Sequence, residues 1–170
     1  ISMVEIVGNQ DDGIEWFGGA VDITGALVWN PGDDGIDTDQ AWSGEVSNFL
    51  VVNPGDNAFE LDGPEGTYTS DNHQIYNGTV YMGNGINLID FDASTDVDLY
   101  DVYFYGFEEG PVVEEYADLE VGTCTNLEVT LPAGVSKADV FVGMPGSEVT
   151  EVAANANTVG PASESGFEWT

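Results

Sequence analysis

The sequence predicts an all-β fold: a β-solenoid of about four coils, followed by a C-terminal β cap or small β module. Two observations lead to this prediction. Similar segments recur every 22 or 23 residues over the first two thirds of the 170-residue chain. Each unit contains short β-type runs separated by turn formers, without the 3.6-residue periodicity of a helix. A β-sandwich is the competing fold, but independent strands would not require the same Gly-Asp-Asp-Gly corner in successive units.

The first repeated element is an acidic corner followed by a strand. Its copies are residues 11–15, 33–37, 56–60 and, in a weaker form, 87–91. Alternation along a strand places the first apolar residue of each copy toward the interior and the carboxylate after it toward solvent. The inward residues would then form a ladder along the solenoid axis and give the chain a narrow apolar core. They are Ile14, Ile36, Phe59 and Ile89.

A second repeated element lies between these corners. Its copies are residues 23–28, 46–51, 75–80 and 99–104, with the turn formers Gly25, Asn48, Asn77 and Asp101 at the third position. Residues 4–7 precede residues 26–29 by 22 positions, so they are expected to be the last strand of an incomplete first coil. The unpaired edge of that coil invites pairing, either with chain that precedes Ile1 or with another subunit.

The pattern changes after Phe107. Residues 1–107 contain the solenoid repeats, and residues 108–170 are expected to form an acidic connector and a C-terminal β cap or module. Strands are expected at residues 127–131 and 140–142, and an irregular segment at residues 153–165. A cap is expected on physical grounds, because the open apolar end of a solenoid must be covered.

The charge of the chain narrows the classes of function. It has 32 Asp and Glu residues against one basic residue, Lys137, and a net charge of −31. This composition excludes nucleic-acid binding, which needs a Lys/Arg footprint on phosphates, and binding to an anionic membrane surface. No apolar run approaches the length of about 18 residues that spans a bilayer. Salt screens self-repulsion and divalent cations remove it locally, so an extracellular or cell-surface location in a saline medium is expected.

The repeats align part of the acidic residues into two columns on the outer surface. One column contains Glu15, Asp37, Glu60 and Asp90, and the other contains Phe17, Asp39, Asp62 and Asp92. Neighbouring coils are about 4.8 Å apart, and like charges that face each other across strands destabilise a sheet. Three interpretations remain open: a solvated acidic face, a calcium site, or a catalytic site.

Calcium would use the column carboxylates together with the acidic corners, because oxygen ligands on neighbouring coils can share one ion. The candidate metal ligands are Asp11, Asp12, Asp33, Asp34, Asp37, Asp39, Asp56, Glu60, Asp62, Asp90 and Asp92. The catalytic alternative, glycoside hydrolysis by paired carboxylates, would use Asp37, Asp39, Glu60 and Asp62. Trp42 or Tyr68 would then be the platform for the sugar.

Four further residues are assigned structural roles. His73 lies in a polar segment and is expected in a surface loop. Asn77 starts an N-glycosylation sequon, but its place among the turn formers favours a turn role. Cys124 is the single cysteine, which excludes an intrachain disulfide, and it is expected to be buried. Trp29 is expected to be exposed.

Residues 4–107 resemble the right-handed parallel β-helix repeats of secreted surface proteins and polysaccharide-active enzymes. The resemblance is carried by Gly32-Asp33-Asp34-Gly35-Ile36-Asp37 and by Gly55-Asp56-Asn57-Ala58-Phe59-Glu60. It implies a parallel β-helix and an extracellular location. The basic catalytic residues of the enzyme members have no counterpart in these repeats, because the only Lys lies outside them and the chain has no Arg.

The leading hypothesis is therefore a non-catalytic, extracellular structural or adhesive β-solenoid with calcium or other cations on its acidic face. Its open first coil would allow end-to-end self-association into an oligomer or filament. The alternative hypothesis is a carbohydrate-binding or glycoside-hydrolysing module whose partner is a polysaccharide. Neither hypothesis involves nucleic acid or insertion into a membrane.

Overall fold

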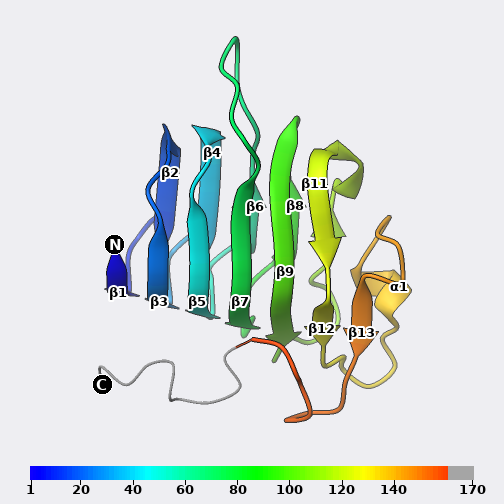
Figure 1. Ribbon diagram of the computed structural model, residues 1–170. Coiled ribbons are helices and arrows are strands. Elements are labelled where there is room, and N and C mark those ends of the chain that lie inside the picture. Colours follow the sequence, from blue (N-terminus) through cyan, green and yellow to red (C-terminus); the bar gives the residue numbers. More distant parts are fainter. Residues whose placement is uncertain (161–170) are drawn as a thin grey trace.

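Two parallel β-sheets face each other across a shared apolar core (Figure 1). The computed structural model describes residues 1–160. The chain alternates between the sheets, so that successive turns stack beside one another. Sheet A contains β1 (Ser2–Val7), β3 (Ile23–Trp29), β5 (Glu45–Val52), β7 (His73–Tyr81), β9 (Thr95–Tyr105), β11 (Leu119–Thr125), β12 (Leu127–Val129) and β13 (Val149–Glu151). Sheet B contains β2 (Ile14–Gly19), β4 (Ile36–Trp42), β6 (Asn57–Leu61), β8 (Asn87–Phe91) and β10 (Val113–Glu114).

The strands pair in the register that the repeats predict, which confirms an all-β parallel β-solenoid. Ile23 pairs with Val46, Val46 with Ile75, and Ile75 with Leu99. Residues 4–7 pair with residues 26–29, as their 22-residue offset predicts. The solenoid has about six turns rather than four, because β10 pairs with β8 and both β11 and β12 pair with β9.

The turn formers of the second repeat make a bend inside sheet A. Gly25, Asn48, Asn77 and Asp101 all have positive φ angles, of 80°, 55°, 56° and 58°. Glycine, Asn and Asp tolerate this left-handed conformation better than other residues do. The same bend therefore recurs in neighbouring strands at equivalent positions, and the expected turn role of Asn77 is confirmed.

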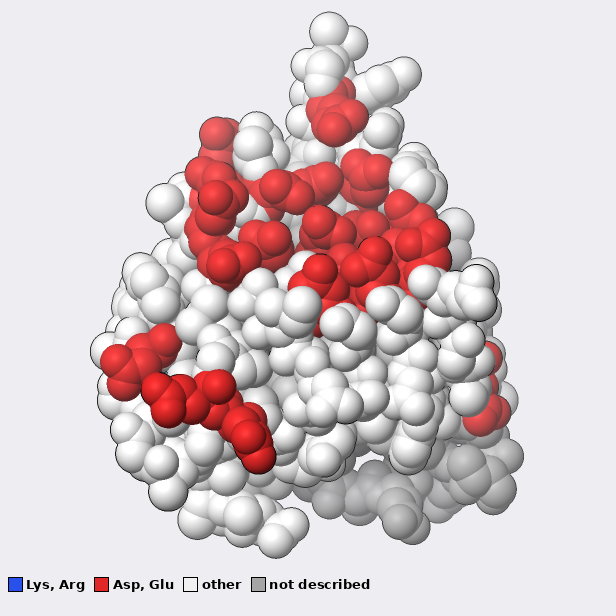
Figure 2. Space-filling view, turned by 180° about the vertical axis from the view of Figure 1, so that it is seen from behind, with Lys and Arg blue, Asp and Glu red and all other residues white. Residues whose placement is uncertain are grey.

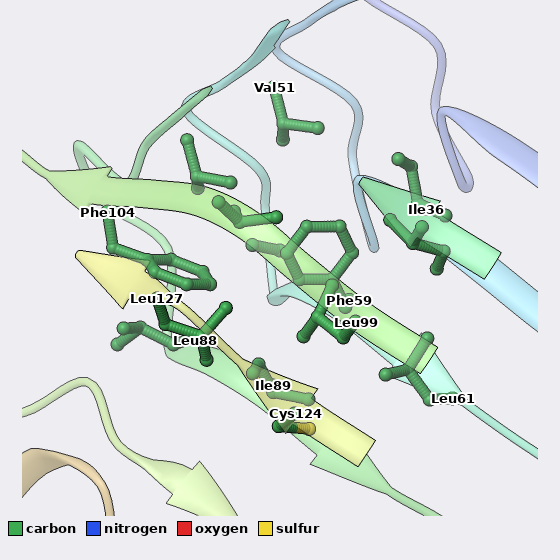
Figure 3. Packing of buried hydrophobic residues seen from close by; sticks show 14 of the residues in the cluster. Ile36, Val51, Phe59, Leu61, Leu88, Ile89, Leu99, Phe104, Cys124 and Leu127 are labelled. Carbon is green, nitrogen blue, oxygen red and sulfur yellow. The ribbon is translucent and has the colours of Figure 1, made fainter. Parts of the chain in front are cut away.

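The inward ladder forms the core between the sheets. Ile36, Phe59 and Ile89 are buried, and Val113 of β10 extends the ladder by one turn. The Phe59 ring packs edge to face against Phe49 and Phe104 of sheet A, with ring centroids 5.8 and 6.0 Å apart. Figure 3 shows Phe59 among side chains that come from both sheets. This contact fastens sheet B to sheet A.

Two predictions about single residues are confirmed. Cys124 is buried beside the core (Figure 3), and burial raises the pKa of its thiol to about 12, so the thiol stays protonated at ordinary pH. Trp29, on the outer face of sheet A, is exposed. An isolated exposed aromatic of this kind needs no functional explanation.

The C-terminal region differs in part from expectation. The strand predicted from residue 127 is present as β12, but residues 140–142 form no strand: a short helix, α1 (Lys137–Val140), ends there. A capping box causes this difference, because the Ser136 hydroxyl and backbone N–H both donate to the Asp139 carboxylate and start the helix. Residues 153–160 contain no helix or strand, as expected, and residues 161–165 lie outside the described residues.

One short 3-10 helix (Tyr116–Asp118) precedes β11. Among the described residues, no helix has the length and apolar character needed to span a membrane.

Candidate functional site: the carboxylate face of sheet B

The first predicted column of carboxylates runs across the whole of sheet B. Glu15 of β2 pairs with Asp37 of β4, Asp37 with Glu60 of β6, and Glu60 with Asp90 of β8. Glu114 of β10 pairs with Asp90 and adds a fifth member that the sequence analysis missed. The alternation in Val113-Glu114 repeats that of Ile89-Asp90, but the residues before it, 108–112, repeat neither the Asp-Asp-Gly corner of the first two copies nor the Asp-Asn-Ala corner of the third.

The second predicted column lies beside the first. Phe17 pairs with Asp39, and the two members that follow lie just after their strands. The Asp62 N–H donates to Thr38 O and the Asp92 N–H donates to Leu61 O, at 2.8 and 2.9 Å. Figure 2, which views the molecule from the side of sheet B, shows these carboxylates gathered into one continuous acidic patch without a Lys or Arg in it.

The acidic corners join the coils through their backbone. Asp12 Oδ1 accepts a hydrogen bond from the Asp34 N–H at 3.1 Å, and Asp34 Oδ1 accepts one from the Asn57 N–H at 2.7 Å. A carboxylate that accepts backbone N–H groups is well placed at a turn. The corner acids therefore have a structural role that does not depend on a ligand.

Carboxylate oxygens from the corners and the first column meet in two clusters. Within each cluster, one oxygen per residue lies within 4.8 Å of the others. The clusters are Asp11, Asp12 and Asp33, and Asp12, Glu15 and Asp37. Glu15 was placed in the column by the sequence but not among the metal ligands, and the structure brings it to them. Asp56 is in neither cluster, and its N–H donates to Asp33 O.

The carboxylates of the first column were expected to face open solvent, and for Asp37 this expectation is wrong. Its exposed fraction is 8%, and that of the corner residue Asp34 is 3%. The alternation along a strand predicts the face of the sheet on which a side chain lies. The strands on both sides are only about 4.8 Å away, however, and their side chains cover Asp37. Asp37 is thus buried among other acids.

Burial and repulsion hold protons on this face. Burial first, and then the charges of Asp12 and Glu15, raise the pKa of Asp37 to about 8. A hydrogen bond with the Asp34 carboxyl, followed by burial, raises the pKa of Glu60 to about 9. Burial and the neighbouring Asp92 raise the pKa of Asp62 to about 7. At neutral pH the face must therefore take up protons or other cations.

The catalytic alternative loses one of its two sugar platforms. Trp42 has an exposed fraction of 1%, stacks on Trp16 with ring centroids 4.4 Å apart, and donates its Nε1–H to Val21 O. It is therefore a core residue at the end of β4. Tyr68, in contrast, is 70% exposed and lines a cavity of about 350 Å³ together with Phe17.

His73 is not in a surface loop, and that prediction is wrong. It begins β7 and is buried, with Nδ1 3.3 Å from Asp96 Oδ1 and Nε2 3.2 Å from the Thr38 hydroxyl. Ser70 Oγ donates to the other Asp96 oxygen at 2.9 Å. The chain neighbours of His73, Asn72 and Gln74, are polar, and this polarity led to the prediction of a surface loop.

A family model for a pectate-lyase-like β-helix domain matches residues 1–163. The chain belongs to this family. No curated protein and no solved structure matches it at a significant level. The match agrees with the parallel β-helix resemblance and extends beyond residue 107.

The pectate-lyase-like β-helix domain keeps its one basic residue away from the acidic face. Lys137 lies in α1, where its Nζ donates to Gly146 O at 3.1 Å and to Val149 O at 2.5 Å. The charged side chains on the face of sheet B are therefore all carboxylates. Such a surface can bind cations or exchange protons, but it supplies no Lys or Arg for binding an anionic sugar.

Proposed function

We propose that this domain is a non-catalytic, extracellular structural or adhesive module whose sheet B face binds calcium. The observation that carries the proposal is the crowding of Asp37 among Asp12, Glu15 and Glu60 with no cationic side chain on the face. Like charges facing each other across strands cost stability, and the neutralising charge has to come from solution.

Calcium suits these clusters better than magnesium does. Calcium accepts six to eight oxygens at about 2.3–2.6 Å in flexible geometry, whereas magnesium requires a near-ideal octahedron and dehydrates reluctantly. The carboxylates of Asp11, Asp12 and Asp33 come from two different corners, and those of Glu15 and Asp37 from two different strands. One ion would therefore tie neighbouring coils together.

A structural or adhesive role agrees with the ends of the sheets. Within residues 1–160, β1 and β2 each pair with a strand on one side only. Val4 and Ile6 of β1 and Ile14 of β2 are half-buried and extend the core to this end. A second copy that added strands here would gain backbone hydrogen bonds and continue the core. End-to-end assembly in a saline, calcium-containing medium is part of the proposal.

Calcium titration of paired variants tests the cation site. Glu15→Gln/Asp37→Asn removes two charges from one cluster, whereas Glu108→Gln/Glu109→Gln removes two charges from an exposed segment. Isothermal titration calorimetry should give at least tenfold weaker calcium binding for the first variant and unchanged binding for the second. Equal calcium affinity in both variants, or no calcium binding to the wild type, would contradict the proposal.

The second candidate function is a glycan-active module, favoured by the cavity between Phe17 and Tyr68 beside the second column. Asp37, Asp39, Glu60 and Asp62 would supply the acid and base of glycoside hydrolysis. Asp37→Asn and Asp62→Asn should then abolish release of reducing sugar from a polysaccharide while the circular-dichroism spectrum stays unchanged. A wild type that releases no reducing sugar from a broad panel of polysaccharides would leave the structural proposal alone.

A further inference from the structure

An open cavity lies at the corner of the solenoid where β7 and β9 end (Figure 1). Its volume is about 550 Å³. The side chains that line it are the Tyr81 ring, the amides of Asn53 and Asn84, and the carboxylates of Glu108 and Glu109. None of them belongs to sheet B or to its acidic clusters, so this cavity is separate from the proposed calcium site.

Two glycines leave the space that the cavity occupies. In the coils before it, the Asn53 side-chain Nδ2–H donates to Asn30 Oδ1 and fills the corner with an amide pair. Gly106 follows β9 as Asn53 follows β5, and it brings no side chain to the corner. Gly83 and Gly106 have φ angles of 55° and 78°, a conformation that favours glycine. A Cβ on Gly106 would also overlap the Tyr81 ring, and one on Gly83 would overlap the Asn53 amide.

The aromatic wall of the cavity is held in place and partly open. The Tyr81 ring packs edge to face against Tyr105, with ring centroids 5.2 Å apart and an interplanar angle of 64°. Tyr105 stacks in turn on Tyr103, with centroids 5.1 Å apart. Tyr81 is nevertheless 37% exposed. The face of an aromatic ring attracts a cation, and the attraction grows when water is displaced.

The acidic wall is a short segment that is anchored at both ends. Phe107 is buried at one end, and at the other end the Leu88 N–H donates to Val112 O at 2.8 Å. Glu108 and Glu109 are exposed between these anchors and line the cavity. The lining contains no Lys or Arg, so both carboxylates are available to a cationic ligand.

An aromatic ring beside carboxylates and amides suits an organic cation better than a metal ion. Calcium takes six to eight oxygen ligands and gains nothing from the ring of Tyr81. The guanidinium group of arginine is planar, stacks on aromatic faces, and carries five N–H donors for carboxylate and amide oxygens. The ammonium group of lysine is a compact, strongly hydrated charge and fits this combination less well.

The guanidinium group cannot come from a second copy of this chain. The sequence has no Arg, and its one Lys, Lys137, donates to Gly146 O and Val149 O. A partner with a different, basic sequence has to supply it. The net charge of −31 complements such a partner and would accelerate its association with the domain.

We propose that this cavity binds an arginine side chain of a basic partner protein. The guanidinium group lies against the Tyr81 ring and pairs with the carboxylates of Glu108 and Glu109. The overall negative charge attracts the partner, and the aromatic wall makes the cavity selective for arginine. The proposal does not depend on calcium binding to sheet B, since the two sites share no residue.

NMR titration of the ¹⁵N-labelled protein with two tripeptides of equal charge tests the site. Acetyl-Gly-Arg-Gly-amide should shift the backbone signals of Tyr81, Gly83 and Gly106 in a saturable way in about 0.3 M sodium chloride, which screens long-range attraction. Acetyl-Gly-Lys-Gly-amide should bind at least threefold more weakly. Millimolar calcium should change the affinity for the arginine peptide by less than twofold, because calcium is expected on sheet B.

Variants separate binding in the cavity from general attraction to an acidic protein. Tyr81→Leu removes the aromatic face and Glu108→Gln/Glu109→Gln removes both charges, and each should weaken the affinity for the arginine peptide at least threefold. Glu120→Gln/Glu151→Gln removes two exposed charges outside the cavity and should weaken it less than twofold. Tm shows whether each variant folds, and the Glu→Gln pairs keep side-chain shape if Tyr81→Leu does not.

Three outcomes would overturn the arginine site. The first is an arginine peptide that leaves the signals of Tyr81, Gly83 and Gly106 unshifted. The second is equal affinity for the lysine and arginine peptides. The third is an equal loss of affinity in the two charge-pair variants, which would mean that net charge alone attracts the peptide.

Discussion

Sheets A and B stack equivalent residues at the same spacing of about 4.8 Å, but with opposite consequences. On the outer face of sheet A, the rings of Tyr76 and Tyr100 stack with centroids 4.8 Å apart and an interplanar angle of 2°. On sheet B, the residues that stack include Asp37 and Glu60, both with raised pKa values. In a solenoid, equivalent residues of successive coils lie next to each other. When they are of the same type, the contact is attractive for tyrosines, whose rings stack, and repulsive for carboxylates, whose charges are alike.

Amides at the corners extend the same rule. The Asn53 side-chain Nδ2–H donates to Asn30 Oδ1 at 2.9 Å, and Asn53 Oδ1 in turn accepts a hydrogen bond from the backbone N–H of Asn84 at 2.8 Å. An amide is both donor and acceptor, so a column of asparagines pairs with itself. A column of carboxylates cannot do so unless protons or cations are added. The carboxylate column of sheet B therefore carries an electrostatic cost that the stacked tyrosines of sheet A avoid, and this cost is the reason for proposing a cation site there.

The largest expected effect breaks the connection between the two sheets. Phe59→Ala would remove the ring that joins β6 to Phe49 and Phe104, and a buried Phe→Ala change costs about 4 kcal/mol of unfolding free energy. Urea denaturation followed by tyrosine fluorescence and by circular dichroism should give one shared transition at lower urea. A loss below about 1 kcal/mol, or separate transitions for the two probes, would show that the sheets are stabilised independently.

The next largest expected effect is the pH dependence of stability, which comes from the carboxylates of sheet B. The pKa values of Asp37, Glu60 and Asp62 are raised to about 8, 9 and 7, from ordinary values of 3.8, 4.5 and 3.8. The folded protein thus binds more protons than the unfolded chain between about pH 4 and pH 9, and stability must fall as pH rises through this range. Solvent screens the partly exposed Glu60 and Asp62, so without divalent cations the unfolding free energy should fall by only about 3 kcal/mol, and Tm by roughly 10 °C, between pH 5 and pH 9.

Calcium should flatten this pH profile, because an ion that replaces the protons supplies the missing charge at high pH. Thermal melts in EDTA and in millimolar calcium at pH 5, 7 and 9 provide the measurement. A profile that rises from pH 5 to pH 9 in EDTA would contradict the raised pKa values. The Glu108→Gln/Glu109→Gln variant serves as control, since these exposed residues should leave the profile unchanged.

The strand register and the two columns were predictable because the repeats align themselves: once Ile14, Ile36 and Phe59 are equivalent, the acid after each must stack. The environment of those acids was not predictable. The alternation along a strand predicts which face of the sheet a side chain lies on. The burial of Asp37 depends in addition on how closely the side chains of the neighbouring strands pack around it. The partners of His73 also could not be inferred, because Thr38 is 35 residues away in the chain.

A single substitution compares the sheets at smaller scale. Asp37→Asn removes a buried charge from sheet B and should stabilise the fold by about 2 kcal/mol at pH 9 in EDTA. Asp98→Asn on sheet A, where Asp98 Oδ1 accepts a hydrogen bond from the Thr123 hydroxyl at 2.9 Å, should change stability by less than about 0.5 kcal/mol. Guanidinium chloride would screen these charges, so urea is the denaturant of choice. Equal effects at both positions would mean that the carboxylate column carries no particular strain.

The smallest expected effect is the coupling energy between two stacked residues, which double-mutant cycles measure. Its sign shows whether the two residues attract or repel each other. For Tyr76→Ala and Tyr100→Ala, the double variant should lose about 1 kcal/mol less than the sum of the single variants, because stacked rings attract. For Glu15→Gln and Asp37→Asn at pH 9 in EDTA, the double variant should gain less than the sum of the single gains, because each substitution relieves the same repulsion between two residues of one cluster. Calcium should reverse that second coupling, since two carboxylates that share an ion depend on each other. If the coupling energies of the two pairs had the same sign in EDTA, stacking would not stabilise sheet A while destabilising sheet B. The reason to expect a cation on sheet B would then be lost.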